Sequence, residues 1–168
     1  MMARKLMLLG EIGVGKSSLV RRLVFDTFEF DYKPTIGVDI YRYDVPDSPG
    51  RDAMTLIVWD TDGNFSDAIF RHVYMREAVA ALIVGDVMRP ETLQSMVKLS
   101  DGFKTQFPGR HAAYVVNKTD LLGENASPSV PSFLQGRGIE THLTSARTGS
   151  AVQNAFHEAA NVIQRRGL

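Results

Sequence analysis

An octapeptide near the N-terminus, Gly-Glu-Ile-Gly-Val-Gly-Lys-Ser at residues 10–17, fits the pattern G-x-x-x-x-G-K-[ST]. The apolar run 6–9 precedes it as a buried strand would, and apolar residues at helical spacing follow it over 18–24. A strand, a glycine turn and a helix in this order direct backbone N–H groups and the positive end of the helix dipole at one point. The octapeptide therefore predicts a phosphate-binding loop. The alternative is a glycine turn that only happens to precede a helix.

Each residue type in such a loop has a chemical task. Glycines at positions 10, 13 and 15 let the backbone turn and approach an anion without a Cβ in the way. Lys16 would reach the β and γ phosphates, and the hydroxyl of Ser17 would complete the shell of a Mg2+ ion. The loop alone leaves ATP and GTP open. Its predicted nucleotide contacts are Gly13, Val14, Gly15, Lys16, Ser17 and Ser18.

The charge balance and the absence of certain residue types limit the classes of partner that we expect for this chain. The 168 residues hold 19 Lys and Arg against 19 Asp and Glu, so no broad positive field favours nucleic acid or an anionic membrane. The absence of cysteine excludes disulfides and prenylation, and Met2 excludes myristoylation, so we expect no direct lipid anchor in this chain. With no bilayer-spanning apolar run and no signal peptide, we expect a cytoplasmic location.

Strand-like and helix-like hydrophobic patterns alternate along the chain. Six strands are predicted, at 6–9, 41–45, 54–59, 79–84, 112–116 and 139–143, and a turn at 47–50 joins the second and third as an antiparallel hairpin. Helices are predicted over 18–24, from Pro90 to Phe107, briefly at 132–135 and from Ser150 onward, within a total of about five. Loops are expected over 25–38 and 60–77. We therefore expect one α/β domain, residues 1–168, with a doubly wound P-loop NTPase fold and a six-stranded, mostly parallel sheet with one antiparallel edge strand.

A second polar motif, Asp60-Thr61-Asp62-Gly63, follows the predicted strand 54–59. Doubly wound sheets bind their ligands beyond the carboxyl ends of the strands, where this motif falls. The carboxylate of Asp60 could meet the metal through a water, and the N–H of Gly63 could face the γ phosphate. An Asp at a strand end is also common by chance. The interpretation of Asp60 as a metal-site residue therefore depends on the phosphate-binding loop that precedes it in the sequence.

A third motif, Asn117-Lys118-Thr119-Asp120, bears on the choice of base. The carboxylate of Asp120 can only accept hydrogen bonds, and guanine offers it a ring N–H beside an exocyclic amine, a pair of donors that adenine lacks. Lys118 would lie along the base plane, Asn117 would tie neighbouring loops together, and the tripeptide 144–146 could offer backbone N–H groups to the guanine oxygen. A merely polar loop is the alternative. The motif opposes the rival assignment to a P-loop ATPase or kinase.

Taken with Pro34-Thr35-Ile36-Gly37, the order of these motifs resembles that of the small GTPases of the Ras superfamily. The segments 32–39 and 58–61, Tyr-Lys-Pro-Thr-Ile-Gly-Val-Asp and Val-Trp-Asp-Thr, look most like the Rab branch, and the resemblance spans residues 4 to about 166. It implies a switch that binds GTP or GDP with Mg2+ and hydrolyses GTP. It also implies two loops, about 26–38 and 60–76, that order around the γ phosphate and contact effectors, exchange factors or GTPase-activating proteins.

The resemblance further implies roles for individual residues. In that family the Thr matching Thr35 closes over Mg2+, and the Phe matching Phe28 packs against the base. Without the resemblance, Thr35 is an ordinary loop residue and Phe28 a core anchor. The implied metal ligands are Ser17, Thr35 and Asp60; the implied catalytic residues are Lys16, Thr35, Gly63 and Asn64; the implied base contacts are Phe28, Asn117, Lys118, Asp120, Ser145, Ala146 and Arg147.

Three positions depart from the family pattern. Asn64 stands where small GTPases usually carry the Gln that orients the attacking water, and Asn is one methylene shorter. Ile12 replaces a residue that is usually small, and its branched side chain could obstruct an arginine supplied by a partner, while Asp62 adds a negative charge beside the phosphates. We expect slow intrinsic hydrolysis. The alternatives are an enzyme that tolerates these variants and a GTP-binding scaffold with little or no GTPase activity.

Other residues carry weaker signals. The four histidines lack metal-ligand spacing, so no zinc site is predicted, and Trp59 is expected in the core. Rab-like proteins usually continue into a tail with prenylated cysteines, whereas this sequence stops at Leu168. Membrane contact is therefore expected only through a partner or through a tail that this sequence lacks.

Overall fold

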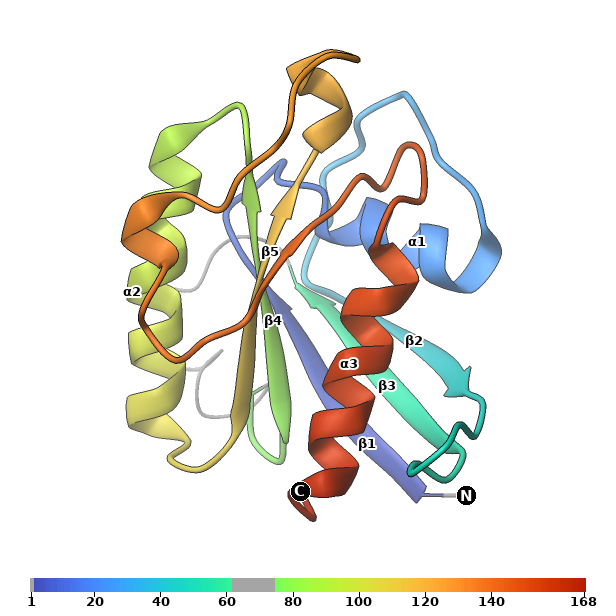
Figure 1. Cartoon of the computed structure of the whole chain (residues 1–168). Coiled ribbons are helices and arrows are strands. Elements are labelled where there is room, and N and C mark those ends of the chain that lie inside the picture. Colours follow the sequence, from blue (N-terminus) through green and yellow to red (C-terminus); the bar gives the residue numbers. More distant parts are fainter. Residues whose placement is uncertain (1, 62–74) are drawn as a thin grey trace.

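The computed structural model describes residues 2–61 and 75–168, in which strands and helices alternate (Figure 1). The strands are β1 (Met2–Leu9), β2 (Val38–Val45), β3 (Met54–Thr61), β4 (Ala80–Asp86), β5 (His111–Asn117) and β6 (Thr141–Leu143). The α-helices are α1 (Lys16–Phe25), α2 (Pro90–Gln106) and α3 (Val152–Arg165), and short 3-10 helices cover Thr119–Leu122 and Ser132–Leu134. The second 3-10 helix is the brief helix expected at 132–135.

The strands form one six-stranded sheet in the order β2-β3-β1-β4-β5-β6. β2 runs antiparallel to β3, in register from Val38 opposite Thr61 to Val45 opposite Met54. The other neighbouring pairs are parallel. The predicted mostly parallel sheet with one antiparallel edge strand is confirmed.

Helices cover both faces of the sheet, which explains why the central strands read as continuous apolar runs. Leu6 and Leu8 of β1 join the apolar cluster under α1 and α3, whereas Met7 and Leu9 join the cluster under α2. None of these four side chains is more than 1% exposed. In Figure 1, α2 lies on one side of the sheet and α1 and α3 lie on the other.

The start of β1 differs from the prediction. The strand begins at Met2, opposite Met54, rather than at Leu6. Pairing with β3 uses backbone groups, so the strand continues through polar residues that an apolar pattern does not detect. Trp59, expected in the core, is only partly buried, and the ammonium of Lys5 lies 3.6 Å from its ring centroid.

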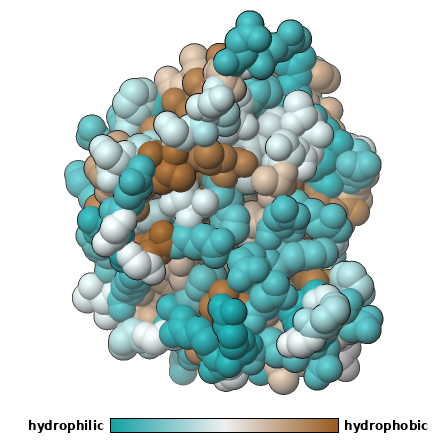
Figure 2. Space-filling view, viewed as in Figure 1, coloured by the Kyte–Doolittle hydropathy of each residue, from teal (hydrophilic) through white to brown (hydrophobic). Residues whose placement is uncertain are grey.

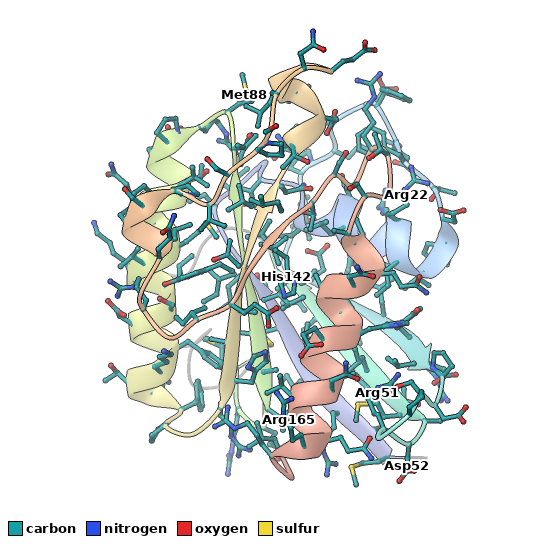
Figure 3. The ribbon with its side chains drawn as sticks, viewed as in Figure 1. Arg22, Arg51, Asp52, Met88, His142 and Arg165 are labelled. Atoms are coloured by element: carbon teal, nitrogen blue, oxygen red, sulfur yellow. The ribbon has the colours of Figure 1, made fainter. Side chains whose placement is uncertain are left out.

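The hairpin of β2 and β3 is attached to α3 at two points. Arg51, which is 5% exposed, donates to the carbonyl of Pro46 at 2.6 Å and to Oδ1 of Asn161 in α3 at 2.7 Å. Figure 3 shows Arg51 at the turn of the hairpin, beside α3. Further along β2, the hydroxyl of Tyr43 lies 3.0 Å from Nε2 of His157. Side-chain contacts to α3 as well as strand pairing therefore hold the β2–β3 hairpin in place.

The outer surface is mostly polar on the face shown in Figure 2, where apolar residues form small separate patches. Several large apolar side chains are exposed between the end of α1 and the start of β2, among them Phe30 and Ile36. Over the ranges that the structure describes, no helix combines the length and the apolar content that a bilayer span requires.

Candidate functional site

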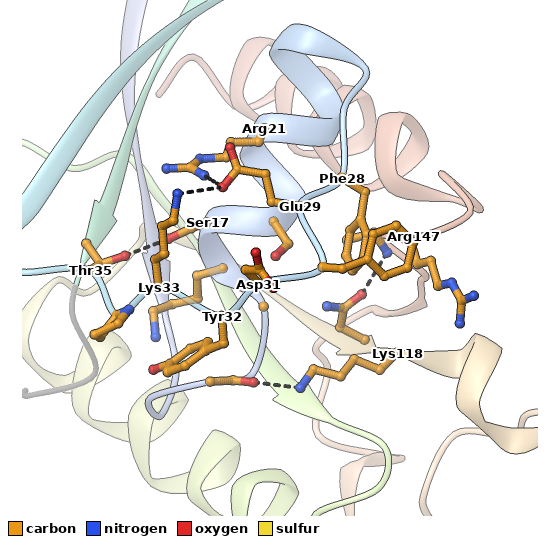
Figure 4. Close-up of a pocket in the computed structure, with 18 of the residues that line it drawn as sticks. Ser17, Arg21, Phe28, Glu29, Asp31, Tyr32, Lys33, Thr35, Lys118 and Arg147 are labelled. Atoms are coloured by element: carbon orange, nitrogen blue, oxygen red, sulfur yellow. Dashed lines mark hydrogen bonds and ion pairs between the residues drawn. The ribbon is translucent and has the colours of Figure 1, made fainter.

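A cavity of about 570 Å³ lies at the carboxyl edge of the sheet (Figure 4). Its walls come from the turn after β1 and the start of α1, the loop 27–36, the end of β3, and the segments after β5 and β6. This volume falls within the range of about 300–1,000 Å³ that is typical of small-molecule sites. The cavity lies where a doubly wound sheet binds its ligand.

The turn between β1 and α1 needs glycine at two closely packed positions. A Cβ on Gly15, whose φ is 102°, would lie 2.4 Å from Nδ2 of Asn117. A Cβ on Gly10 would lie 2.4 Å from the carbonyl oxygen of Val84. α1 begins directly after Gly15, and no side chain caps its first turn. The positive end of the helix dipole therefore faces the cavity, which favours an anion there.

The ammonium of Lys16 lies across this turn. Its Nζ donates to the carbonyl of Gly10 at 2.7 Å and to that of Glu11 at 3.0 Å, and the residue is 6% exposed. The predicted phosphate contacts Gly13, Gly15, Lys16, Ser17 and Ser18 line the cavity, and Val14 is fully buried. The structure therefore places a cation beside the anion-binding turn.

The three predicted metal ligands meet on one side of the cavity. The hydroxyl oxygens of Ser17 and Thr35 lie 2.6 Å apart, and the Ser17 hydroxyl donates to Oδ2 of Asp60. Asp60 is fully buried, and in the described part of the chain its Oδ1 has no hydrogen-bond partner. Burial raises the pKa of the Asp60 carboxyl to about 6, against the opposing effects of the Ser17 hydrogen bond and the Lys16 charge. A buried carboxylate oxygen without a partner, beside two hydroxyls, fits a hard cation such as Mg2+.

Asn117 and Lys118 join the opposite end of the cavity to the phosphate loop. Asn117, which is 1% exposed, donates from Nδ2 to the carbonyl of Val14 at 3.1 Å. Its Oδ1 accepts from the hydroxyl of Thr144 and from the N–H of Ala146. Lys118 donates from Nζ to the carbonyl of Gly13 at 2.7 Å. Asn117 therefore makes the contacts between loops that the sequence predicts.

Asp120 and the segment after β6 form the far wall of the cavity. The hydroxyl of Ser145 donates to Oδ1 of Asp120 at 2.7 Å, and Nη1 of Arg147 lies 3.9 Å from Oδ2. The backbone N–H groups of residues 144–146, expected to be available to guanine, donate instead to protein oxygens. These pairs are Thr144 with Val116, Ser145 with Ser150, and Ala146 with Asn117. The difference arises because the Asn117 side chain and the neighbouring backbone supply acceptors that the motif itself does not reveal.

Phe28 lies at the same end of the cavity. It lines the cavity, packs against the core cluster under α1, and meets Phe30 edge-on with 5.1 Å between ring centroids. The guanidinium of Arg147 lies 5.4 Å from the Phe30 centroid. Figure 4 shows Phe28 and Arg147 on the side of the cavity that Lys118 also borders. Phe28 is therefore both a core anchor and a wall of the cavity.

Comparison with known proteins agrees with this arrangement, because residues 5–165 match the Ras family. The chain belongs to the Ras family. It is 32% identical over 164 residues to the Ras-related protein RABF2b of Arabidopsis thaliana, covering 96% of this chain and 81% of that protein. It is 31% identical over 159 residues to human Ras-related protein Rab-32, covering 90% and 70%, and 30% identical over 163 residues to Rab-5B of Plasmodium falciparum, covering 96% and 78%. The chain is therefore a Rab-like member of the Ras superfamily, as the segments 32–39 and 58–61 predict.

Part of the site predicted for this Ras-family domain lies outside the described residues. Asp62, Gly63 and Asn64 belong to the range 62–74, as does most of the second predicted loop, 60–76. Asp60 and Thr61 belong to β3, so the strand continues two residues beyond its predicted end at Trp59. The roles of Gly63 and Asn64 therefore stay predictions.

The sequence motifs did not single out Asp86, the last residue of β4. It is 3% exposed, and its Oδ2 lies 2.8 Å from Nζ of Lys118 and accepts from Nε of Arg89 at 3.2 Å. Burial acts to raise the pKa of Asp86, but hydrogen bonds from Lys118, from the Met88 N–H and from Arg89 hold it below the usual value. The signal that could have identified Asp86 is its place at the end of a buried strand, on the same sheet edge as Asp60 and Asn117.

Proposed function

We propose that this Rab-like domain binds guanine nucleotide together with Mg2+ and hydrolyses GTP to GDP, so that its two nucleotide states form a molecular switch. The observation that carries the proposal is the single cavity that joins the loop 10–17 to the carboxylate of Asp120. An anion-binding turn at one end and an acceptor-only group at the other suit the two ends of GTP. Membership of the Ras family supports the same function.

The proposed complex places the phosphates on the backbone N–H groups of residues 13–18. Lys16 would exchange its bonds to the Gly10 and Glu11 carbonyls for β and γ phosphate oxygens. Ser17, Thr35 and Asp60 would hold Mg2+, which supplies charge neutralisation at the phosphate oxygens when it is bound. The N–H of Gly63 would face the γ phosphate, as the motif predicts.

The base would lie between Phe28 and the stem of Lys118, with Ala146 and Arg147 at its edge. Asp120, oriented by the Ser145 hydroxyl, would accept from the ring N–H and the exocyclic amine of guanine. Adenine lacks this pair of donors, so ATP would not give the carboxylate the two hydrogen bonds that guanine donates. Sites that lose a required hydrogen-bond partner discriminate by about 10⁴-fold, which is the preference we expect for GTP over ATP.

We further propose that hydrolysis is slow. Asn64 is one methylene shorter than the usual Gln, and a displacement of about 1 Å from attack geometry lowers a rate by roughly 100-fold. Ile12 is 58% exposed on the phosphate loop, where its side chain would crowd an arginine supplied by a partner. The alternative function is a GTP-binding scaffold that barely hydrolyses its ligand, and Asn64 is the residue that favours it.

Partner proteins would contact the loop 26–38 together with the segment 60–76. Phe30, Tyr32 and Ile36 are 76%, 64% and 93% exposed. The same loop carries Thr35, so its position would depend on the metal and the γ phosphate, and effectors, exchange factors or GTPase-activating proteins would distinguish the two states. A switch of this kind needs a supply of GTP, so we place it in the cytoplasm. Membrane contact would be made through a partner or through chain beyond this sequence.

Identifying the nucleotide that the purified protein carries tests the switch against the scaffold. Bound GDP supports the switch, and retained GTP supports the scaffold. Thermal shifts with GTP, GDP and ATP test the base, because a ligand at about 100 times its Kd stabilises the folded state by about 2.7 kcal/mol. Equal shifts with ATP and GTP would contradict the guanine assignment.

Single-turnover hydrolysis of GTP tests the proposed slow rate. We expect a rate roughly 10- to 100-fold below the intrinsic rate of Ras, which is about 4 × 10⁻⁴ per second, and an increase of roughly 10- to 100-fold in Asn64→Gln. A wild-type turnover at or above the intrinsic rate of Ras would contradict slow hydrolysis.

A further inference from the structure

The first half of the phosphate loop is attached to the junction between β4 and α2. Nη2 of Arg89, the residue before α2, donates to the carbonyl of Ile12 at 2.9 Å. In the second turn of α2, the hydroxyl of Ser95 donates to a carboxylate oxygen of Glu11. The loop therefore contacts the junction through a backbone carbonyl and the second turn of α2 through a side chain. Met88, which is labelled in Figure 3, belongs to this junction.

A buried carboxylate orients the cations that hold the loop. Oδ2 of Asp86 accepts from Nε of Arg89 at 3.2 Å and lies 2.8 Å from Nζ of Lys118, while Oδ1 accepts from the N–H of Met88 at 2.9 Å. Lys118 in turn donates to the carbonyl of Gly13 at 2.7 Å. One carboxylate thus directs two cations onto two consecutive loop carbonyls, those of residues 12 and 13.

These contacts fix the orientation of a peptide plane beside the cavity. In a trans peptide the C=O and N–H groups point in opposite directions, so the bond from Arg89 to the Ile12 carbonyl turns the N–H of Gly13 away from Arg89. Ile12 and Gly13 both line the cavity. Gly13 has a φ of 79°, and glycine adopts many backbone conformations with little cost, so the loop requires an outside constraint to keep one of them.

We propose that Arg89, oriented by Asp86, is a positioning residue that keeps the Ile12–Gly13 peptide in the conformation that receives the nucleotide phosphates. The inference rests on the proposed function, since its ligand is a guanine nucleotide. Arg89 uses Nε for Asp86 and Nη2 for Ile12, and a lysine cannot reproduce this planar fork. In this role Arg89 acts through the loop and does not touch the nucleotide.

Release of fluorescent mant-GDP from the full chain, loaded with Mg2+ and chased with excess GDP, tests the proposal. Arg89→Gln should release mant-GDP about 10-fold faster than the wild type, because a charge-assisted hydrogen bond to the loop is lost. Arg89→Lys keeps the charge but not the fork, so it should give a smaller increase. The melting temperature should change little in both variants, since the Arg89 side chain is 38% exposed.

Arg137→Gln is the matched control. Arg137 also pairs with a carboxylate on α2, Asp101 at 2.8 Å, and its side chain is 32% exposed, but its Nη2 donates to Asp101 rather than to a carbonyl of the phosphate loop. Its release rate should equal that of the wild type. An unchanged rate in Arg89→Gln, or an equal increase in Arg137→Gln, would overturn the positioning role.

A measurement of GTP hydrolysis distinguishes the positioning role of Arg89 from a direct action on the γ phosphate. If Arg89→Gln slows GTP hydrolysis and leaves mant-GDP release unchanged, Arg89 acts on the γ phosphate and the positioning role is overturned. If the wild-type protein takes up no mant-GDP, the proposed function itself is rejected. The two failures are therefore distinguishable.

Discussion

The two ends of the cavity differ in how far the protein alone satisfies their polar groups. At the end proposed for the guanine base, called the base end below, the side chain of Asn117 bonds to the phosphate loop and to the segment after β6, and Asp120 accepts from Ser145. All of these contacts are between groups of the protein itself. The protein therefore builds the base end into its fold.

At the end proposed for Mg2+, called the metal end below, two hydroxyl groups and a carboxylate lie close together. Ser17 lies between Thr35 and Asp60, and Oδ1 of Asp60 has no partner within the described ranges. A buried charge with a free oxygen destabilises the protein until a cation or a proton neutralises it. The polar groups around Asn117 and Asp120 are therefore paired within the protein, whereas Oδ1 of Asp60 still needs a partner. Under the proposed function, selectivity for the base is preformed and the metal end is completed by Mg2+.

The largest expected effect is at the base end, in Asp120→Ala. Two donors of the guanine base would lose their acceptor, at about 1–3 kcal/mol each, so GDP affinity should fall by about 10³-fold. Titration with mant-GDP measures it. Asp101→Ala is the control, because Asp101 pairs with Arg137 on the surface. A loss smaller than about 10-fold would show that the base end is not the source of guanine selectivity.

The next largest effect is on stability, in Asn117→Ala. The substitution removes contacts to Val14, Thr144 and Ala146 from a fully packed position. The free energy of unfolding of the nucleotide-free protein should fall by about 3 kcal/mol, which lowers the melting temperature by roughly 6–12 °C. Calorimetry measures the change, and Asn154→Ala, at an exposed position of α3, should leave it unaltered. An equally small change in both variants would remove the claim that the base end is preformed.

Asp60→Asn should stabilise the metal-free protein, whereas Asn117→Ala should destabilise the nucleotide-free protein. Replacing a buried charge by a neutral amide should raise the unfolding free energy of the metal-free protein by about 1–2 kcal/mol near neutral pH, while Mg2+ binding to the GDP complex weakens. Denaturant unfolding in EDTA and a Mg2+ titration measure the two effects. Destabilisation as large as that of Asn117→Ala would mean that both ends are equally complete without ligand.

The smallest expected effect is a pH dependence that belongs to neither end. Burial, with smaller contributions from Arg166 and His142, lowers the pKa of His111 to about 4 from the ordinary 6.5. The unfolded chain binds this proton below pH 6.5 and the folded chain does not until about pH 4. Stability should therefore fall as the pH drops through this window, by about 1–2 kcal/mol after allowance for solvent screening.

His111→Asn should flatten this dependence in pH-resolved denaturant unfolding. His111 begins β5, at the end of the strand opposite the cavity, so its contribution should be the same with and without GDP. A contribution that changes with GDP would show that the start of β5 is coupled to the nucleotide site. The pH dependence of stability that remains in His111→Asn belongs to the rest of the protein, including the two ends of the cavity.

Much of this site could be predicted because its residues follow mostly apolar strands. The runs before Gly10 and Asn117 are buried on both faces, and the run before Asp60 is buried on one face and partly buried on the other, so the sequence marks where each strand ends and where polar chemistry begins. In a doubly wound sheet those ends meet at one edge. The motifs therefore indicate where the cavity lies even without the order of the strands.

Contacts that depend on the order of strands in the sheet could not be predicted. Arg89, which is paired with Asp86, reaches Ile12 because β4 lies beside β1, which no local pattern specifies. The N–H of Ala146 pairs with Asn117 for the same reason, since β5 lies beside β6. The polar start of β1 was missed because pairing with β3 stabilises a segment whose side chains carry no strand signal.

The attachment of the β2–β3 hairpin to α3 has a mechanical consequence. Sliding β3 along β1 with the same side chains facing inward requires a step of two residues, about 6.6 Å. Such a step would separate Arg51 from Asn161 and Tyr43 from His157, which now lie 2.7 Å and 3.0 Å apart. Contacts to α3 thus hold the hairpin at its turn, and pairing with β1 holds β3 along its length. A displacement that starts at Thr35 would therefore move the start of β2, next to the cavity, and leave the turn of the hairpin in place.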